Sequence, residues 1–272
     1  MKKMDLSPWR IRHESPCRLS DFNTQPEGVL AYSEDEVRHQ TKKLSVRLNK
    51  LQTQLHAANS HAVLLVLQGM DTSGKDGVIR HVFANVSPLG VRAVPFSAPT
   101  EAELKHDFLW RVHHKVPARG ELVIFNRSHY EDVLVTRVHK LIDKSTCSKR
   151  YEHIAHFESL LHNSGTTVIK CYLHISKGEQ KKRLQQRIDD PARHWKLQPS
   201  DFADRKLWPK FISAYEDTLS ATSTKNAPWY IVPADSKSHR DLFIATLLVQ
   251  TLESLDLKLP TANFSFEDVI LR

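Results

Sequence analysis

The residues with the clearest chemistry lie in the loop from Gly69 to Gly77, which reads GMDTSGKDG. Its G-x-x-x-x-G-K spacing, between a short apolar run and a helical pattern, is typical of a phosphate-binding P-loop. The glycines let the backbone curl with its N–H groups inward, and the helix start adds positive dipole. Lys75 supplies a mobile positive charge for phosphate groups. The alternative to a phosphate-binding loop is an ordinary turn between a strand and a helix. The predicted phosphate contacts are Gly69, Met70, Thr72, Ser73, Gly74, Lys75, Asp76 and Gly77.

Two acids in this loop indicate a metal ion. The position after the lysine usually carries a hydroxyl that binds Mg²⁺, but here it is Asp76. An acid inside a phosphate loop repels phosphate unless a cation lies between them. We therefore predict that Asp71 anchors Mg²⁺. For Asp76 we expect the common role of an acid in the first turn of a helix, in addition to its place in the motif.

A second concentration of charge lies between residues 181 and 196. Arg183 and Arg187 are four residues apart and predict two guanidinium groups on one helix face, beside a packed edge of Leu184 and Ile188. Like charges at this spacing repel unless an anion bridges them. Pro191 ends the helix, and Arg193, Trp195 and Lys196 continue the basic character. Beside a P-loop this favours a lid at about residues 183–206 that closes over the transferred group; the alternative is a solvated basic helix.

The elements that must position these residues alternate between strand and helix. Strands are expected at 63–67, 91–96, 122–125, 167–175 and 229–232, and the Pro95 strand should lie at an edge. This pattern predicts a three-layer α/β/α sandwich with a mainly parallel, five-stranded sheet. The helix after Ser33 carries an apolar stripe that could be intramolecular or serve a subunit contact, formed by Leu44, Leu48, Leu51 and Leu55.

Four helix starts show a hydroxyl residue followed three positions later by glutamate, which is the capping-box pattern. The pairs are Ser33 with Glu36, Thr100 with Glu103, Ser128 with Glu131, and Ser176 with Glu179. The helix after Thr100 is expected to run through Leu104, Phe108 and Val112. The helix after Ser128 is expected to carry Val133, Leu134, Val138 and Leu141.

Ligands of parallel α/β sheets bind outside the carboxyl ends of the strands. Arg127 directly follows the strand 122–125 and should project toward phosphate held by Lys75. A surface arginine at a helix start would be electrostatically unfavourable, which favours a functional role for Arg127. Asp132 has no capping partner and could reach the metal. Glu131 remains open between capping and a direct ligand role.

Composition limits the remaining possibilities. The 272 residues fit one P-loop domain at 29–258, with an irregular arm at 1–28 and a tail at 259–272. A net charge of +8 and a pI of about 9.3 predict an anionic partner. The sequence contains no basic tract with interleaved aromatic residues, which argues against nucleic acid as the partner. The apolar run at 242–249 is too short to span a bilayer. With no secretory signal pattern and three scattered cysteines, we expect a cytoplasmic protein.

Four segments of the chain carry a family resemblance. These are the motif 69–77, the segment 125–132 (FNRSHYED), the basic segment ending DPARHWK and the stretch 228–235 (PWYIVPAD). In them the chain resembles the polyphosphate kinase 2 family. This resemblance covers about residues 30–255. It implies a thymidylate-kinase-like P-loop fold with a helical lid and reversible, Mg²⁺-dependent phosphoryl transfer between inorganic polyphosphate and adenine or guanine nucleotides. The enzyme would make ATP from ADP and also ADP from AMP. It would be a homo-oligomer, either a dimer or a tetramer.

The resemblance also implies roles for single residues. Asp71 and Asp132 would bind metal, Lys75 would bind phosphates, and Arg127 and Arg183 would hold the transferred group. The further predicted substrate-binding residues are Arg80, Asn126, Glu131, Arg137, Arg187, Arg193 and Lys196. Many members carry Asp where this chain has Asn126, and the Asn form resembles a single-domain subgroup that favours nucleotide synthesis.

Two other functions remain open at this point. One is an ATP-dependent P-loop kinase that phosphorylates a nucleotide or a small metabolite. The other is a non-catalytic protein that uses its P-loop as a nucleotide switch or binds nucleic acid through a basic surface. The paired arginines of the expected lid favour catalysis over the switch.

Overall fold

The structure of the protein, a computed structural model, describes residues 4–13 and 15–261. The predicted tail at 259–272 lies outside the described residues from 262 onward. A parallel five-stranded sheet forms the centre, in the order β2-β3-β1-β4-β5. The strands are β1 (Ala62–Gln68), β2 (Val91–Pro95), β3 (Leu122–Asn126), β4 (Thr166–His174) and β5 (Trp229–Pro233). The predicted sheet is confirmed, including the edge position of the strand that contains Pro95.

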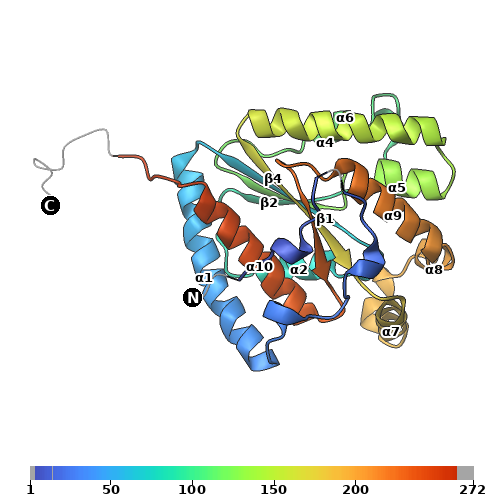
Figure 1. The fold of residues 1–272 in the computed structure, drawn as a ribbon, viewed down its shortest axis with the longest axis horizontal. Coiled ribbons are helices and arrows are strands. Elements are labelled where there is room, and N and C mark those ends of the chain that lie inside the picture. The colour runs from blue at the N-terminus through green and yellow to red at the C-terminus, as the bar shows by residue number, and fades with distance from the viewer. Residues whose placement is uncertain (1–3, 14, 262–272) are drawn as a thin grey trace, which may run out of the picture.

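Helices cover both faces of this sheet (Figure 1). One face carries α1 (Glu34–Ala58), α2 (Lys75–Val82) and α10 (Lys237–Ser254). The other carries α5 (Glu131–Val138), α6 (Lys144–Asn163) and α9 (Trp208–Thr222). Beyond the carboxyl ends of the strands lie α7 (Lys177–Ile188), the 3₁₀ turn η4 (Pro191–Lys196) and α8 (Pro199–Lys206). The layers are those of the predicted α/β/α sandwich.

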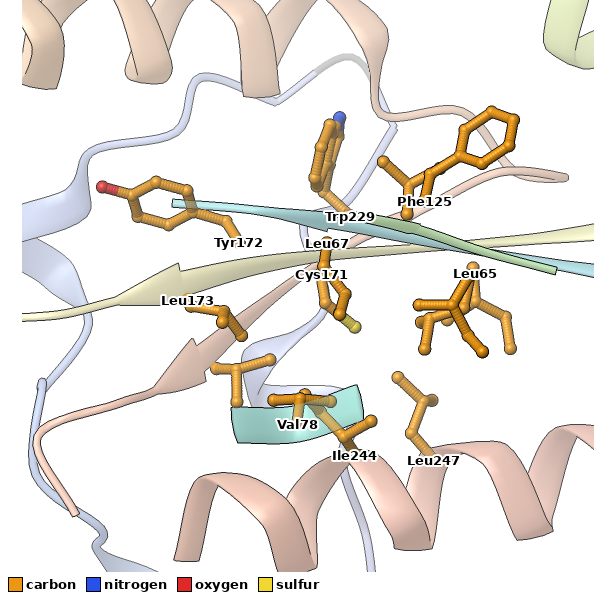
Figure 2. Packing of buried hydrophobic residues seen from close by; sticks show 14 of the residues in the cluster. Leu65, Leu67, Val78, Phe125, Cys171, Tyr172, Leu173, Trp229, Ile244 and Leu247 are labelled. Carbon is orange, nitrogen blue, oxygen red and sulfur yellow. The ribbon is translucent and has the colours of Figure 1, made fainter. Parts of the chain in front are cut away.

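The core lies on both sides of the sheet because helices exclude water from each face. Every residue of β1 is buried, as expected for a central parallel strand with an unbroken apolar sequence. Figure 2 shows Cys171 and Leu173 pointing toward Val78 of α2 and Ile244 of α10, while Trp229 points to the opposite face. Packing on both faces holds the strand ends, and therefore the loops after them, in fixed positions.

The apolar stripe of α1 faces inward. Leu44, Leu48, Leu51 and Leu55 are all buried, and α1 packs along α10 (Figure 1). The stripe is therefore an intramolecular contact, and the expected homo-oligomer stays a prediction. No helix among the described residues is long and apolar enough to cross a membrane.

The N-terminal arm contains three short 3₁₀ turns, at Ser7–Trp9, Leu19–Asp21 and Gly28–Leu30. The amide of Ile11 donates to the carbonyl of Trp229 at 2.9 Å, and Arg10 forms an antiparallel bridge with Tyr230. The arm thus covers the free edge of β5, where exposed backbone groups would otherwise be open to another strand.

Two predicted helices differ from the structure. The stretch after Thr100 keeps its capping box, but it forms two short helices, α3 (Glu101–Leu104) and α4 (Trp110–His113), instead of one. The Asp107 carboxylate accepts from the amide of Leu109 at 2.9 Å, and this local bond competes with continuous helix. Leu104 is consequently 67% exposed.

The expected capping box of Ser128 and Glu131 is also wrong. The Ser128 hydroxyl accepts from the amide of Tyr130 at 3.2 Å and from the Gln68 side chain at 3.1 Å. The helix begins two residues later than expected, with Tyr130 instead of Ser128 as N-cap, and ends at Val138 before Leu141. Glu131 is left free to bond elsewhere.

Candidate active site

A cavity of about 890 Å³ opens at the carboxyl ends of the strands. Its lining comes from the P-loop and α2, from the ends of β2 and β3, from the segment α7-η4-α8, and from the start of α10. Segments more than a hundred residues apart in sequence meet here because parallel strands end at the same edge of the sheet. The P-loop and the basic segment, predicted to face each other, therefore share one cavity.

The P-loop backbone is held in conformations that favour glycine. Gly74 has φ 106°, and Thr72 has φ 63°, a value that is uncommon outside glycine and asparagine. A Cβ on Gly69 would lie 2.7 Å from the Ser73 hydroxyl and 2.9 Å from the carbonyl of Leu173. The buried hydroxyls of Thr72 and Ser73 have no hydrogen-bond partner among the described residues. Buried polar atoms are normally paired, so these hydroxyls are suited to a bound ligand such as phosphate.

Lys75 lies buried at the first position of α2. Its Nζ donates to the carbonyls of Gly69 at 2.8 Å and Met70 at 3.4 Å. Burial, and then repulsion by Arg127, lowers the pKa of Lys75 to about 8. The ammonium is therefore less well solvated than a surface lysine, and a bound anion would stabilise its charged form.

Arg127 adopts a strained conformation at the end of β3, with φ 62°. Its guanidinium donates to Asp71 at 2.6 Å and to Glu131 at 3.3 Å. Glu131 first, and then Asp71, raises the pKa of Arg127 against the effect of burial. Backbone strain at a non-glycine residue persists only where the surroundings enforce it, as they do at functional sites. The predicted projection of Arg127 toward the P-loop is present in this structure.

A buried network fixes the segment after Arg127. The Tyr130 hydroxyl donates to Glu158 at 2.7 Å, and the Lys170 ammonium donates to the same carboxylate at 2.6 Å. Lys170 also donates to the carbonyl of Thr222 at 2.6 Å. These groups are fully buried, so the network ties the loop after β3 to β4, α6 and α9 without help from solvent.

The wall opposite the P-loop carries cations from α7 and η4. Arg187, Arg193 and Lys196, the predicted substrate-binding residues of this segment, line the cavity, and the 74% exposed Trp195 lies beside them. Arg80 lines the cavity from the end of α2. The two walls together place positive charge on both sides of one hollow.

Arg183 differs from its predicted position beside Arg187 on an open face. It is buried with Leu184, while Ile188, expected in the packed edge, is 42% exposed. Its guanidinium touches the cavity, but all of its N–H groups are used within the protein. They donate to Glu179 and to the carbonyls of Thr72, Ser73, Ala234 and Asp235. In this structure Arg183 holds the P-loop to α7 and to the segment after β5.

Some predicted residues are not among those that line the cavity. Asp132 faces Arg111 and Arg150 at 3.8 and 3.9 Å, and burial raises its pKa. Arg137 bonds to Asp217 and Tyr151 on another part of the surface. Gly69, Met70, Ser73 and Glu131 are likewise not among the lining residues. Asp76 and Asn126 do line the cavity, and the Asn126 amide donates to Asp76 at 2.7 Å.

The donor set fits Mg²⁺ in part. No group of three or more histidine, cysteine or acidic side chains suited to a metal occurs among the described residues. Mg²⁺ often binds through one or two carboxylates together with substrate phosphates, and Asp71 on the cavity wall satisfies that requirement. A role for Asp132 as a second ligand stays a prediction, since arginines and not the cavity surround it here.

Several lining residues were missed from the sequence, among them Phe96, Asp201, Lys237 and Arg240. Burial, and then the nearby Asp71, raises the pKa of Asp201. Lys237 and Arg240 lie in the first turn of α10, only a few residues after the strand end at 233. The rule that ligands bind at strand ends could have found them if it had been extended by one helical turn.

Comparison with known proteins gives consistent matches over almost the whole chain. A family model described as Polyphosphate kinase 2 (PPK2) matches residues 31–260. A Meiothermus ruber protein named AMP/ADP-polyphosphate phosphotransferase is 44% identical over 266 residues, covering 98% of this chain and 100% of that protein. A Rhodopseudomonas palustris protein named ADP-polyphosphate phosphotransferase is 41% identical, covering 95% of this chain and 89% of its own length. The crystal structure of polyphosphate kinase 2 from Arthrobacter aurescens superposes with a TM-score of 0.91 at 39% identity, covering 97% of this chain and 95% of that one.

Proposed function

Because this chain belongs to the polyphosphate kinase 2 family, we propose that it is an enzyme that transfers phosphoryl groups reversibly between inorganic polyphosphate and nucleotides. The observation that carries this proposal is the shared cavity, in which a P-loop faces a wall of arginine and lysine side chains. A single nucleotide needs only a few cations, whereas an extended polyanion needs a line of them. Reactant and product are chemically similar, so concentrations set the direction of the reaction.

The residues act by positioning and by neutralising charge, since phosphoryl transfer needs little covalent help from the protein. The P-loop amides and Lys75 bind phosphate oxygens from one side. Arg127 lies beside them and balances negative charge that develops during transfer. Arg187, Arg193 and Lys196 bind the polyanion from the opposite side, and a closing movement of residues 183–206 would exclude water.

We propose Mg²⁺ as the metal, held by Asp71 together with phosphate oxygens. When bound beside Asp71, the ion would supply positive charge that neutralises phosphate. The ion pair of Asp71 with Arg127, at 2.6 Å, keeps the carboxylate on the cavity wall and screens its charge from an arriving phosphate. The same contact links the metal ligand to the residue that stabilises the transferred group.

Nucleotide choice is the finer part of the proposal. The Meiothermus ruber relative is named for both AMP and ADP, and the Rhodopseudomonas palustris relative for ADP alone. We propose that this enzyme makes ATP from ADP and also ADP from AMP, with Asn126 beside the P-loop as one determinant of the subgroup. We further propose that it acts in the cytoplasm as a homo-oligomer; its three buried free thiols suit a reducing compartment.

The decisive experiment mixes purified protein, Mg²⁺, polyphosphate and either ADP or AMP, and measures new ATP or ADP. We expect product in both mixtures, none when polyphosphate is omitted, and none when EDTA removes the metal. A parallel reaction with ATP and small acceptors tests the rival ATP-dependent kinase. Phosphorylation of such an acceptor without any response to polyphosphate would overturn the proposal.

A further inference from the structure

Arg240 is a buried arginine packed directly against the P-loop. It lies in the first turn of α10 and is 1% exposed, yet it reaches the lining of the cavity. Its Nη1 donates to the carbonyl of Ser73 at 3.3 Å. A Cβ on Gly74 would lie 1.8 Å from the same nitrogen. The second glycine of the G-x-x-x-x-G-K motif, Gly74, is therefore required for two reasons: its φ of 106° and the guanidinium beside it.

The placement of this guanidinium is electrostatically costly. It lies beside the N-terminus of α2, where the helix dipole disfavours a cation. Burial lowers the pKa of Arg240, so its charge is less well solvated than on the surface. Asp241 compensates by accepting from Nε at 2.9 Å and from Nη2 at 2.6 Å. The other oxygen of Asp241 bonds to the His81 ring at 2.9 Å, which fixes the orientation of the carboxylate.

Arg240 and Arg183 hold the same carbonyl from different helices. Nη1 of Arg183 also donates to the Ser73 carbonyl, at 3.3 Å. A trans peptide is planar, with its C=O and N–H pointing in opposite directions. Fixing the Ser73 carbonyl therefore fixes the direction of the Gly74 N–H, which belongs to the same peptide unit. That N–H has no backbone or side-chain acceptor among the described residues, and it lies at the start of α2, where an anion binds.

Arg183 and Arg240 differ in how many of their N–H donors remain available for a ligand. Arg183 uses every N–H group within the protein, whereas Nη1 and Nη2 of Arg240 each make one hydrogen bond among the described residues. Arg240 therefore keeps donor capacity and positive charge beside the cavity. A purely structural anchor would need neither a place in the cavity lining nor unused donors.

We propose that Arg240, oriented by Asp241, is a positioning residue of the P-loop that sets the Ser73–Gly74 peptide for anion binding. It acts from the first turn of α10. The inference deepens the proposed function, because the anion concerned is the phosphate chain of the substrate.

The test compares Arg240→Gln/Asp241→Asn and Arg240→Lys with a matched control, Arg47→Gln. The double substitution removes both charges together, so it leaves no unpaired buried ion. The control removes one arginine and breaks the 2.8 Å ion pair of Arg47 with Glu253, which joins α1 to the far end of α10. For the double variant we expect kcat/KM for polyphosphate to fall about 10- to 100-fold, the range for losing hydrogen bonds made by a charged group. KM for the nucleotide should stay within about twofold, and Arg240→Lys should recover part of the loss by restoring the charge.

A second measurement separates this inference from the proposed function. Tripolyphosphate should raise the melting temperature of the wild type and of Arg47→Gln equally, and that of the double variant by less than half as much. An equal shift, or a kcat/KM for polyphosphate within twofold of wild type, would overturn the role of Arg240. Should wild type bind tripolyphosphate but transfer no phosphate to nucleotides, the proposed function fails and the melting data still decide on Arg240.

Discussion

At the residue scale, Lys75 and Asp71 carry opposite charges in one loop and should both be needed for turnover. Lys75→Ala removes the cation that faces phosphate, and Asp71→Asn removes the carboxylate assigned to Mg²⁺. We expect each change to lower kcat by at least ~10²-fold, as for loss of a group that stabilises transition-state charge. Lys50→Ala, an exposed change on α1, serves as control and should keep kcat. Near-normal turnover in either site variant would show that the chemistry lies elsewhere.

The pKa of Lys75 predicts a pH limit for substrate capture. Burial, followed by Arg127, lowers this pKa from 10.5 to about 8, so the free enzyme loses the ammonium charge as pH rises through about 8. Above that pH, kcat/KM for polyphosphate should fall by about tenfold per pH unit. Bound polyphosphate favours the ammonium and raises its pKa, so the corresponding decline in kcat should begin at higher pH. Identical declines in kcat and kcat/KM would assign the titration to another group.

At the element scale, side chains of three other elements hold the loop after β3 in position through hydrogen bonds. Arg127 is strained, and residues 128–130 are tied to β1, α6 and β4 through Gln68, Glu158 and Lys170. Burial alone would raise the pKa of Glu158, but Lys170 and His129 lower it, so the carboxylate stays ionised. We expect this buried pair to stabilise one loop conformation more than it stabilises the fold as a whole.

This arrangement predicts strong coupling between Glu158 and Lys170. Glu158→Gln should lower the free energy of unfolding by about 3–5 kcal/mol, because it leaves a buried ammonium without its counter-ion. Adding Lys170→Met should restore part of this loss, while kcat stays reduced because the loop that carries Arg127 is less well held. Urea denaturation of the two single variants and the double variant gives the coupling energy. Additive losses would show that the two side chains act independently.

At the scale of the whole molecule, the chain carries a net charge of +8, and lysines and arginines outnumber aspartates nine to four in the lining of the cavity between the P-loop, α7, η4 and α10. Binding a polyanion there should release counter-ions, as it does for nucleic acids. We expect KM for polyphosphate to rise steeply as NaCl increases from about 50 to 200 mM, with a linear dependence of log KM on log salt concentration. KM for ADP should change less, because ADP carries fewer charges. Equal salt dependence for both substrates would contradict an extended cationic site.

The amino-acid sequence by itself determined the family and the layered α/β fold with its parallel strands, and it predicted the phosphate loop. These features follow from local signals: apolar runs of strand length, helical periodicity, and a motif whose glycines and lysine lie within nine residues. Capping boxes were reliable at Ser33 and Thr100, where nothing outside the helix competes for the hydroxyl. At Ser128 the same pattern failed, because Gln68 of a neighbouring strand lies within hydrogen-bond distance of that hydroxyl.

Only the tertiary structure decided which charged side chains face the cavity and which hold other groups in place. Arg183 and Arg187 look alike in sequence and both line the cavity, yet Arg183 donates all of its N–H groups within the protein, to P-loop carbonyls among others. Asp132 belongs to the segment 125–132 that carries the family resemblance, but it lies between Arg111 and Arg150. Arg240 belongs to no motif. The physical reason is that burial and hydrogen-bond partners depend on segments far apart along the chain, which meet only when the parallel strands align their carboxyl ends.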